Sequence, residues 1–162
     1  MEISAINRVY VSWTSMKLWV KAWLFWLNVV LLAAFAFLHD PLAWATLVSL
    51  PVTFVLLMGI ALYHGGMVRI LGLGHLIPWL PLLAYLDFRM TGSLVGPQIT
   101  YAGDPGLFIW TVVLGLTLGV CLALDFYDVV RWQRGERFVL GSKAAHAAGA
   151  SEYMPRLTDR KL

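Results

Sequence analysis

The stretch WLFWLNVVLLAAFAFL, residues 23–38, decides the fold class of this chain. Apart from its tryptophan indoles, it carries one polar side chain, that of Asn28. With its apolar flank it extends over about 18–38, which is the roughly 20 apolar residues that a helix needs to cross a membrane. Its apolar residues do not alternate as in a barrel strand, and lipid offers no water to an unpaired backbone, so this stretch predicts a transmembrane helix.

Three further apolar stretches predict spans at about 42–63, 70–86 and 107–127. The third is short, and we expect Pro78 and Pro81 to kink it, because proline removes a backbone donor. The composition agrees: 60% of the residues are hydrophobic and 13% are charged, whereas a soluble domain has about 25% charged residues. The sequence therefore predicts an all-α integral membrane protein, a bundle of four transmembrane helices over residues 18–130.

The connections predict how the spans are arranged. Tight turns at 39–41 and 64–66 indicate that the first three spans pack as antiparallel neighbours. Residues 87–106 form the one long connection and are expected to be an irregular outer surface. Of the twelve Lys and Arg residues, only Arg89 lies on the outer side of this arrangement. Because cytoplasmic loops are enriched in Lys and Arg, we expect both termini in the cytoplasm, and the short loops favour a bacterial plasma membrane.

The two ends of the chain are polar. Residues 1–17 are expected to be a cytoplasmic segment, either an interfacial helix or a frayed tail. Residues 131–162 form a basic tail that anionic lipid headgroups attract, with a flexible linker at 141–151; no motif for nucleic acid is present. A cleaved signal peptide ending near Ala43-Trp44-Ala45 is the alternative for the first span, but such cleavage would fall inside the second span.

Small residues recur every fourth position in the last span. These are Thr111, Gly115, Gly119 and Ala123, which include a GxxxG pattern. Small side chains allow two helix backbones to approach closely in a membrane. The stripe predicts a packing surface, used either within the monomer or between two copies in a dimer.

Two polar side chains stand out within the spans. Asn28 lies near the middle of the first span, so we expect it to face another helix and to hydrogen-bond there. His75 lies roughly 8 Å inside the third span at 1.5 Å per residue. An ionisable group in a membrane is a candidate functional residue. The alternative is a structural, neutral histidine bonded to Asn28, Thr53 or Thr117.

The inner end of the last span carries charges at helical spacing. Asp125, Asp128 and Arg131 lie one turn apart, and carboxylates near a helix C-terminus need partners. Arg69 and His64 are expected at similar depth. One interpretation is an ion-pair network at the inner face. The other is a polar site open to the cytoplasm, in which His64, His75, Asp125 and Asp128 hold a metal or relay a proton.

The sequence requires no cofactor. The different depths of His64 and His75 disfavour a haem with two histidine ligands, and the single cysteine, Cys121, excludes a dithiol mechanism within one chain. HExxH, P-loop and GxSxG motifs and internal repeats are absent from the sequence, so it assigns no catalytic residue.

Three functional hypotheses remain. The first is a non-catalytic accessory subunit or homo-oligomeric membrane component, in contact with lipids and with a further membrane partner. The second is a protein that handles a quinone, a lipid or a proton, with or without redox chemistry, around His75. The third is a small oligomeric transporter or channel.

Overall fold

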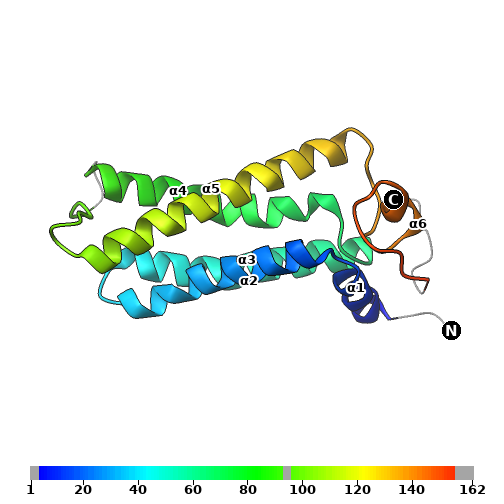
Figure 1. The fold of residues 1–162 in the computed structure, drawn as a ribbon, viewed down its shortest axis with the longest axis horizontal. Helices are drawn as coiled ribbons and strands as arrows, with labels where there is room; N and C mark the ends of the chain where they lie inside the picture. The colour runs from blue at the N-terminus through cyan, green and yellow to red at the C-terminus, as the bar shows by residue number, and fades with distance from the viewer. Residues whose placement is uncertain (1–3, 93–95, 156–162) are drawn as a thin grey trace.

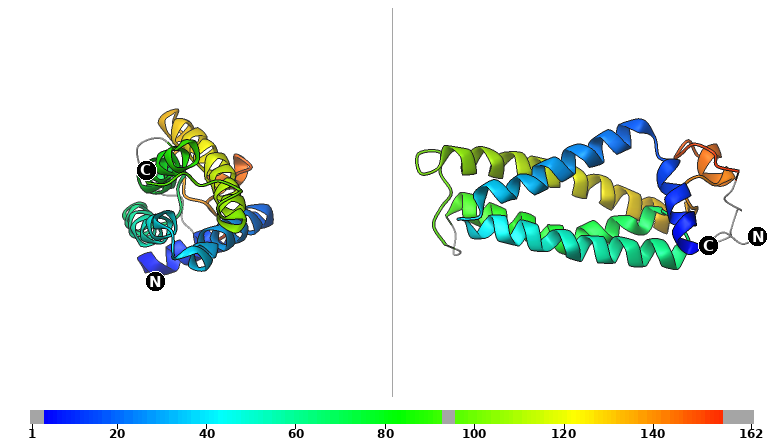
Figure 2. Two further views of the ribbon diagram at one scale, coloured as in Figure 1. Left: turned by 90° about the vertical axis from the view of Figure 1, so that its left-hand side faces the viewer. Right: turned by 90° about the horizontal axis from the view of Figure 1, so that it is seen from below.

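The computed structural model describes residues 4–92 and 96–155, and the regular elements there are all helical. Four segments are long and apolar enough to cross a membrane. They are α2 (Leu18–Leu32) continued by η1 (Ala33–Phe37), α3 (Pro41–His64), η2 (Arg69–Leu71) continued by α4 (Gly72–Thr91), and α5 (Pro105–Gln133). They run side by side along the molecule (Figure 1), and an end-on view shows them grouped around one axis (Figure 2). The prediction of an all-helical chain with four membrane-length helices is confirmed for the described residues.

Asp-Pro pairs begin two of the long helices. Asp40 accepts a hydrogen bond from the backbone N–H of Leu42 at 2.8 Å and so caps α3. Asp104 caps α5 in the same way, accepting from Leu107 at 3.0 Å. The proline that follows each aspartate sits in the first helical turn, where its missing N–H leaves no bond unmade. Both turns are therefore fixed by local sequence.

The third and fourth spans are longer than expected. The helix through α4 continues to Thr91 rather than ending near 86, so Asp87 and Arg89 lie in the helix and not in the long loop. Helix α5 continues to Gln133. The loop that joins them also contributes to the core, since Ile99 is buried.

Helix α4 lies between α3 and α5. Gly72 and Gly74 allow α4 to approach both of these helices closely. A Cβ atom on Gly72 would come within 2.8 Å of the backbone oxygen of Asp125 in α5, and one on Gly74 within 2.7 Å of Leu57 in α3. The helices can lie this close together only because these two residues have no Cβ atom. The buried core between the helices includes Trp79, Leu114 and other large apolar residues.

The polar segments before and after the four long helices, residues 4–17 and 134–155, fold together at one end of the bundle. Helix α1 (Ala5–Thr14) and helix α6 (Lys143–Ala147) both lie there (Figure 1). The backbone N–H of Glu152 donates to the carbonyl of Ser15 at 2.9 Å, and that of Leu140 to Met67 at 2.8 Å. Part of the segment expected to be a flexible linker, residues 143–147, is helical. Ser142 caps α6, and its alanine-rich sequence favours helix.

Candidate functional site

A polar cluster of His75, Cys121 and Asp125 lies between α4 and α5, within the membrane-length segments. His75 Nδ1 is 3.0 Å from Asp125 Oδ2, and the thiol of Cys121 donates to the same oxygen at 3.5 Å. Cys121 is buried, and the side chains of His75 and Asp125 are only 14% and 16% exposed. A carboxylate, an imidazole and a thiol thus share one largely dry position.

The helix geometry brings these three side chains together. Cys121 and Asp125 are four residues apart, so they share one face of α5. Gly72 permits α5 to approach the start of α4 closely, which places His75 opposite that face. The indole of Trp79, one turn further along α4, stacks on the His75 ring with a centroid distance of 4.5 Å and an interplanar angle of 18°. The imidazole is therefore held between an ionisable partner and an aromatic plane.

The described hydrogen bonds do not join His75 to Asn28, Thr53 or Thr117, the partners expected for a structural histidine. The hydroxyl of Thr53 donates to the backbone oxygen of Ser49 at 2.8 Å. The hydroxyl of Thr117 accepts from the Trp26 indole at 3.3 Å. His75 pairs instead with Asp125, because the close approach of α4 and α5 makes the carboxylate its neighbour.

Asn28 lies on the outer surface of the bundle, so no other helix among the described residues supplies the hydrogen bond that was expected for it. Its amide nitrogen donates to the backbone oxygen of Leu24, one turn back in the same helix, at 2.7 Å. The interior face of α2 is formed by Leu27, Val30 and Leu31, which are buried. Because α2 is apolar on nearly every side, packing rather than polarity determines which face is turned inward.

An ion-pair network lies at the end of α5. Arg69 pairs with Asp128, and its Nε lies 3.0 Å from Glu136 Oε2 without hydrogen-bond alignment. Arg131 Nε donates to Glu136 Oε1 at 2.7 Å. This hydrogen bond from Arg131 is the main reason why the pKa of Glu136 lies below its ordinary value. Glu136, which lies just after the helix, thus joins two arginines that the sequence placed near Asp128.

His64 belongs to neither the ion-pair network nor the polar cluster. It ends α3, and its ring packs edge-on against Trp132 with a centroid distance of 5.2 Å. Among the described residues, the group of three or more His, Cys, Asp or Glu side chains whose donor atoms come together is that of His75, Cys121 and Asp125. The four-residue grouping of His64, His75, Asp125 and Asp128 is not one site in this geometry.

The small-residue stripe of α5 is only partly used within the chain. Thr111 is fully buried, and a Cβ on Gly115 would contact Leu86 of α4 at 3.3 Å. At Gly119 an added Cβ would meet no atom within 4 Å, and Ala123 is exposed. The half of the stripe near Thr111 therefore packs inside the monomer, whereas the other half does not.

A buried ion pair at the opposite end of the bundle was not identified from the sequence. The guanidinium of Arg89 is 1% exposed and donates to both carboxylate oxygens of Asp40, at 3.1 and 2.7 Å. It also donates to the backbone oxygen of Pro97 at 3.1 Å and to the hydroxyl of Tyr85 at 3.3 Å. Arg89 therefore ties the start of α3, the end of α4 and the following loop together. Arg89 is the one Lys or Arg residue on the outer side of the predicted spans. This could have indicated that it pairs with an acidic residue there.

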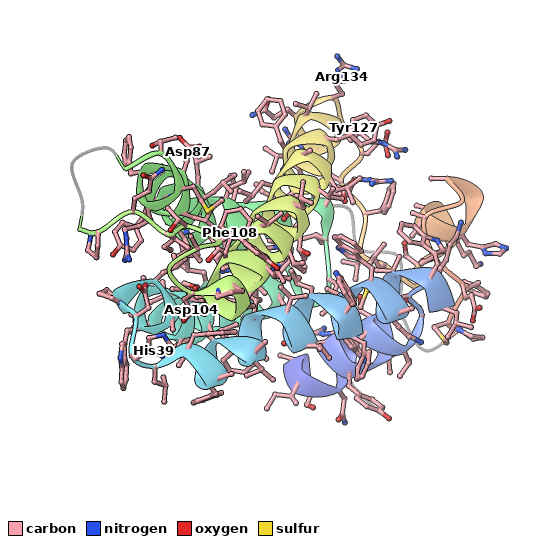
Figure 3. All side chains as sticks on the ribbon, turned by 60° about the vertical axis from the view of Figure 1, so that its left-hand side comes forward. His39, Asp87, Asp104, Phe108, Tyr127 and Arg134 are labelled. Atoms are coloured by element: carbon pink, nitrogen blue, oxygen red, sulfur yellow. The ribbon has the colours of Figure 1, made fainter. Side chains whose placement is uncertain are left out.

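A second pair at the same end is exposed. His39 Nε2 lies 3.1 Å from Asp104 Oδ2, and both residues are labelled in Figure 3, well away from Tyr127 and Arg134. The backbone hydrogen bond from Leu107 is the main cause of a lowered pKa at Asp104. This pair supports a turn and presents no enclosed site.

Sequence reasoning also passed over Cys121 as a cluster member. Its spacing of four residues from Asp125 was the signal that could have placed both on one helix face. Comparison of the chain with protein-family models, with curated proteins and with solved structures finds no match in any of the three.

Proposed function

We propose that this chain is a multi-pass protein of a bacterial plasma membrane, with both terminal segments in the cytoplasm. The location of α1 and α6 at one end of the bundle supports this topology, as does the concentration of Lys and Arg at that end. We also propose that α4 is kinked. Pro78 and Pro81 lie inside it and leave the carbonyls of Gly74 and Ile77 without their helical donors.

Within that membrane the chain acts as a non-catalytic component that associates through α2, with a second copy as the partner. The observation that carries this proposal is the exposure of Asn28 near the middle of the span Leu18–Phe37. Its one hydrogen bond among the described residues, to Leu24, leaves the amide oxygen and one N–H without a partner there. Polar groups left without partners in hydrocarbon are costly, so a neighbouring helix that supplies those partners is favoured.

The residues around Asn28 form a stripe suited to helix pairing. Phe25, Asn28, Leu32 and Phe35 follow at spacings of three and four residues, and all are exposed. This is the spacing of a coiled-coil seam, in which one asparagine fixes register and oligomeric state. An amide both donates and accepts, so two copies related by a two-fold axis satisfy each other's Asn28. This self-complementarity favours a second copy over an unrelated subunit.

The test is the dissociation constant of the dimer in detergent or bilayers, measured by energy transfer between labelled chains. Replacing Asn28→Leu should raise it about three- to thirtyfold, since an interhelical hydrogen bond in a membrane contributes about 0.6–2 kcal/mol. Val55→Leu, a change at an exposed position of α3, is the control and should leave it unchanged. A monomeric wild type, or an Asn28→Leu protein that dimerises as well as wild type, would contradict the proposal.

A second candidate function is the handling of a ligand or a proton at His75. The specific observation that favours it is the ionisable pair of His75 and Asp125 between two membrane-length helices. Purified wild type and His75→Gln would be extracted with organic solvent and compared for bound quinone and lipid, and for proton uptake on acidification. A ligand or a proton step lost only in a folded His75→Gln protein would support this function. Identical results for the two proteins would exclude it.

A further inference from the structure

We infer that His75, Cys121 and Asp125 form a binding site for a divalent transition-metal ion of the Zn²⁺ type. One donor atom from each residue lies within 4.8 Å of the others. Nitrogen, thiolate sulfur and carboxylate oxygen are the three ligand types that Zn²⁺ binds in proteins. The inference names a ligand for the second candidate function, and it does not require that the chain dimerises.

The distances suit a tetrahedral ion. Bond lengths of about 2.0–2.3 Å place neighbouring ligand atoms about 3.3–3.6 Å apart around Zn²⁺. The sulfur–oxygen distance between Cys121 and Asp125 is 3.5 Å, and the nitrogen–oxygen distance between His75 and Asp125 is 3.0 Å. The Cys121–Asp125 distance thus already suits such an ion, and the imidazole and the carboxylate would have to separate by a few tenths of an ångström. The third pair, His75 and Cys121, lies within the 4.8 Å that encloses all three donor atoms.

The charge of the donor set also fits a divalent cation. A thiolate from Cys121 and the carboxylate of Asp125 carry two negative charges, and a neutral His75 adds none. A bound dication makes the assembly electrically neutral, which is the state that a low-dielectric interior favours. Binding replaces the thiol proton of Cys121 with the metal, so this proton is released to solvent.

The donor set selects among metals. Mg²⁺ and Ca²⁺ prefer shells made of oxygen ligands, and this site offers one oxygen-bearing residue of three. Imidazole and thiolate favour Zn²⁺, and Co²⁺ takes the same sites with lower affinity. Three protein ligands leave one coordination position for an exogenous ligand, as in sites where the metal contacts a substrate or water.

An unused donor beside the site supports this inference. The indole N–H of Trp79 is buried and has no hydrogen-bond partner among the described residues. A buried donor of this kind is rare in native proteins and calls for a partner. Trp79 stacks directly on His75, so this buried N–H belongs to a side chain in contact with one of the metal ligands. The stacking also fixes the plane of the imidazole, as outer-shell residues commonly do for metal ligands.

Cobalt spectroscopy of the full-length protein tests the inference. The protein would be purified in mild detergent, freed of any histidine tag, stripped with a chelator and titrated with Co²⁺. We expect one ion per chain, a thiolate-to-cobalt charge-transfer band, visible bands of tetrahedral intensity, and displacement by Zn²⁺. Co²⁺ affinity should rise with pH because a thiol proton is released. A wild-type protein without the charge-transfer band would overturn the inference.

Matched variants separate the site from adventitious binding. Cys121→Ser retains a hydroxyl that can donate to Asp125 but removes the thiolate. It should abolish the charge-transfer band and weaken Co²⁺ binding at least about tenfold. His39→Gln removes an exposed histidine at the far end of the bundle and should change nothing. A band that survives in Cys121→Ser, or is lost in His39→Gln, would overturn the inference.

Two further measurements keep the result interpretable. Circular dichroism and gel filtration establish whether Cys121→Ser is folded, and if it is not, His75→Gln takes its place. His75→Gln keeps the thiolate, so it should weaken Co²⁺ binding at least about tenfold rather than abolish the charge-transfer band. Asn28→Leu should keep the cobalt spectrum whatever its oligomeric state, so failure of the dimer proposal and failure of the metal site are distinguishable. A dimeric wild-type protein without cobalt binding refutes only the metal site.

Discussion

Replacing Asp40→Asn should destabilise the protein strongly, because it removes the counter-charge of Arg89. Asparagine caps a helix about as well as aspartate, so the start of α3 keeps its hydrogen bond to Leu42. The change therefore isolates the ion pair from the cap. The Arg89 guanidinium, which is 1% exposed, would keep its positive charge without an anion.

The magnitude follows from how Arg89 is held. It donates two hydrogen bonds to Asp40, and its other acceptors among the described residues are the neutral oxygens of Pro97 and Tyr85. Breaking a buried pair by removing one partner costs about 3–5 kcal/mol, whereas replacing both charges by groups of similar size is often nearly neutral. We therefore expect Asp40→Asn to lower the free energy of unfolding by about 3 kcal/mol or more. Adding Arg89→Met should recover most of that loss.

The assay is a double-mutant cycle of Asp40→Asn and Arg89→Met. Unfolding would be measured by circular dichroism in mixed micelles in which the wild type refolds reversibly. We expect a coupling energy of about 2–3 kcal/mol, near the upper end for residues in direct contact. Asp104→Asn is the matched control. It changes the same Asp-Pro cap at the start of α5, but its partner His39 is exposed, so unfolding should stay near that of wild type.

The reasoning would be refuted by a coupling energy below about 0.5 kcal/mol, which is the scatter expected for independent sites. It would also be refuted if Asp104→Asn were as harmful as Asp40→Asn. In that case the loss would come from weakened helix caps rather than from an unpaired buried charge.

Two further predictions concern helix contact and pH. Gly72→Ala should destabilise by about 1–3 kcal/mol in the same unfolding assay, because its Cβ would lie 2.8 Å from the α5 backbone. Gly119→Ala, where a Cβ meets nothing, should be neutral or stabilising by up to about 1 kcal/mol, and equal effects of the two changes would contradict this account. Because Arg131 lowers the pKa of Glu136 below 4.5, the stability from Glu136 is fully present above that value and is lost as the pH falls through the lowered pKa. Proteolysis of residues 137–152 should therefore increase in acid for wild type but depend less on pH in Glu136→Gln, and identical pH profiles would refute this link.

The four helices were predictable because lipid restricts a spanning chain to a helix or a barrel. Apolar stretches of sufficient length therefore identified each helix without knowledge of the packing. The ends were less predictable. Charges near 87 and 89 indicated a loop, since hydropathy treats Arg89 as a solvated group. The partner that makes its burial possible, Asp40, lies 49 residues away in sequence and is adjacent only after folding.

The orientation of side chains around each helix was the main property that the sequence could not provide. The hydrophobic pattern of an amphipathic helix indicates which face is buried. Because α2 is apolar on nearly every side, its pattern does not indicate a buried face. Asn28 was expected to face another helix, and within this chain it lies on the outer surface of the bundle. His75 was identified as unusual from its residue type alone. Its partner required the close approach of two helices at Gly72, which no local pattern specifies.

Polar groups of the long helices differ in how many hydrogen-bond partners they need. This difference decides which of them need a partner outside their own helix. The hydroxyls of Thr46, Thr53 and Thr111 each donate to a carbonyl one turn back in their own helix, at 2.7–2.8 Å. A hydroxyl that donates its proton in this way can be buried in an apolar helix without a hydrogen-bond partner from another helix.

An amide has two N–H donors and an acceptor oxygen. The single hydrogen bond from Asn28 to its own helix therefore leaves most of its hydrogen-bonding capacity unused. The buried indole N–H of Trp79 has no partner among the described residues. Asn28 and Trp79 therefore require something beyond their own helices, which we assign to a second copy at Asn28 and to the ligand of a bound metal at Trp79.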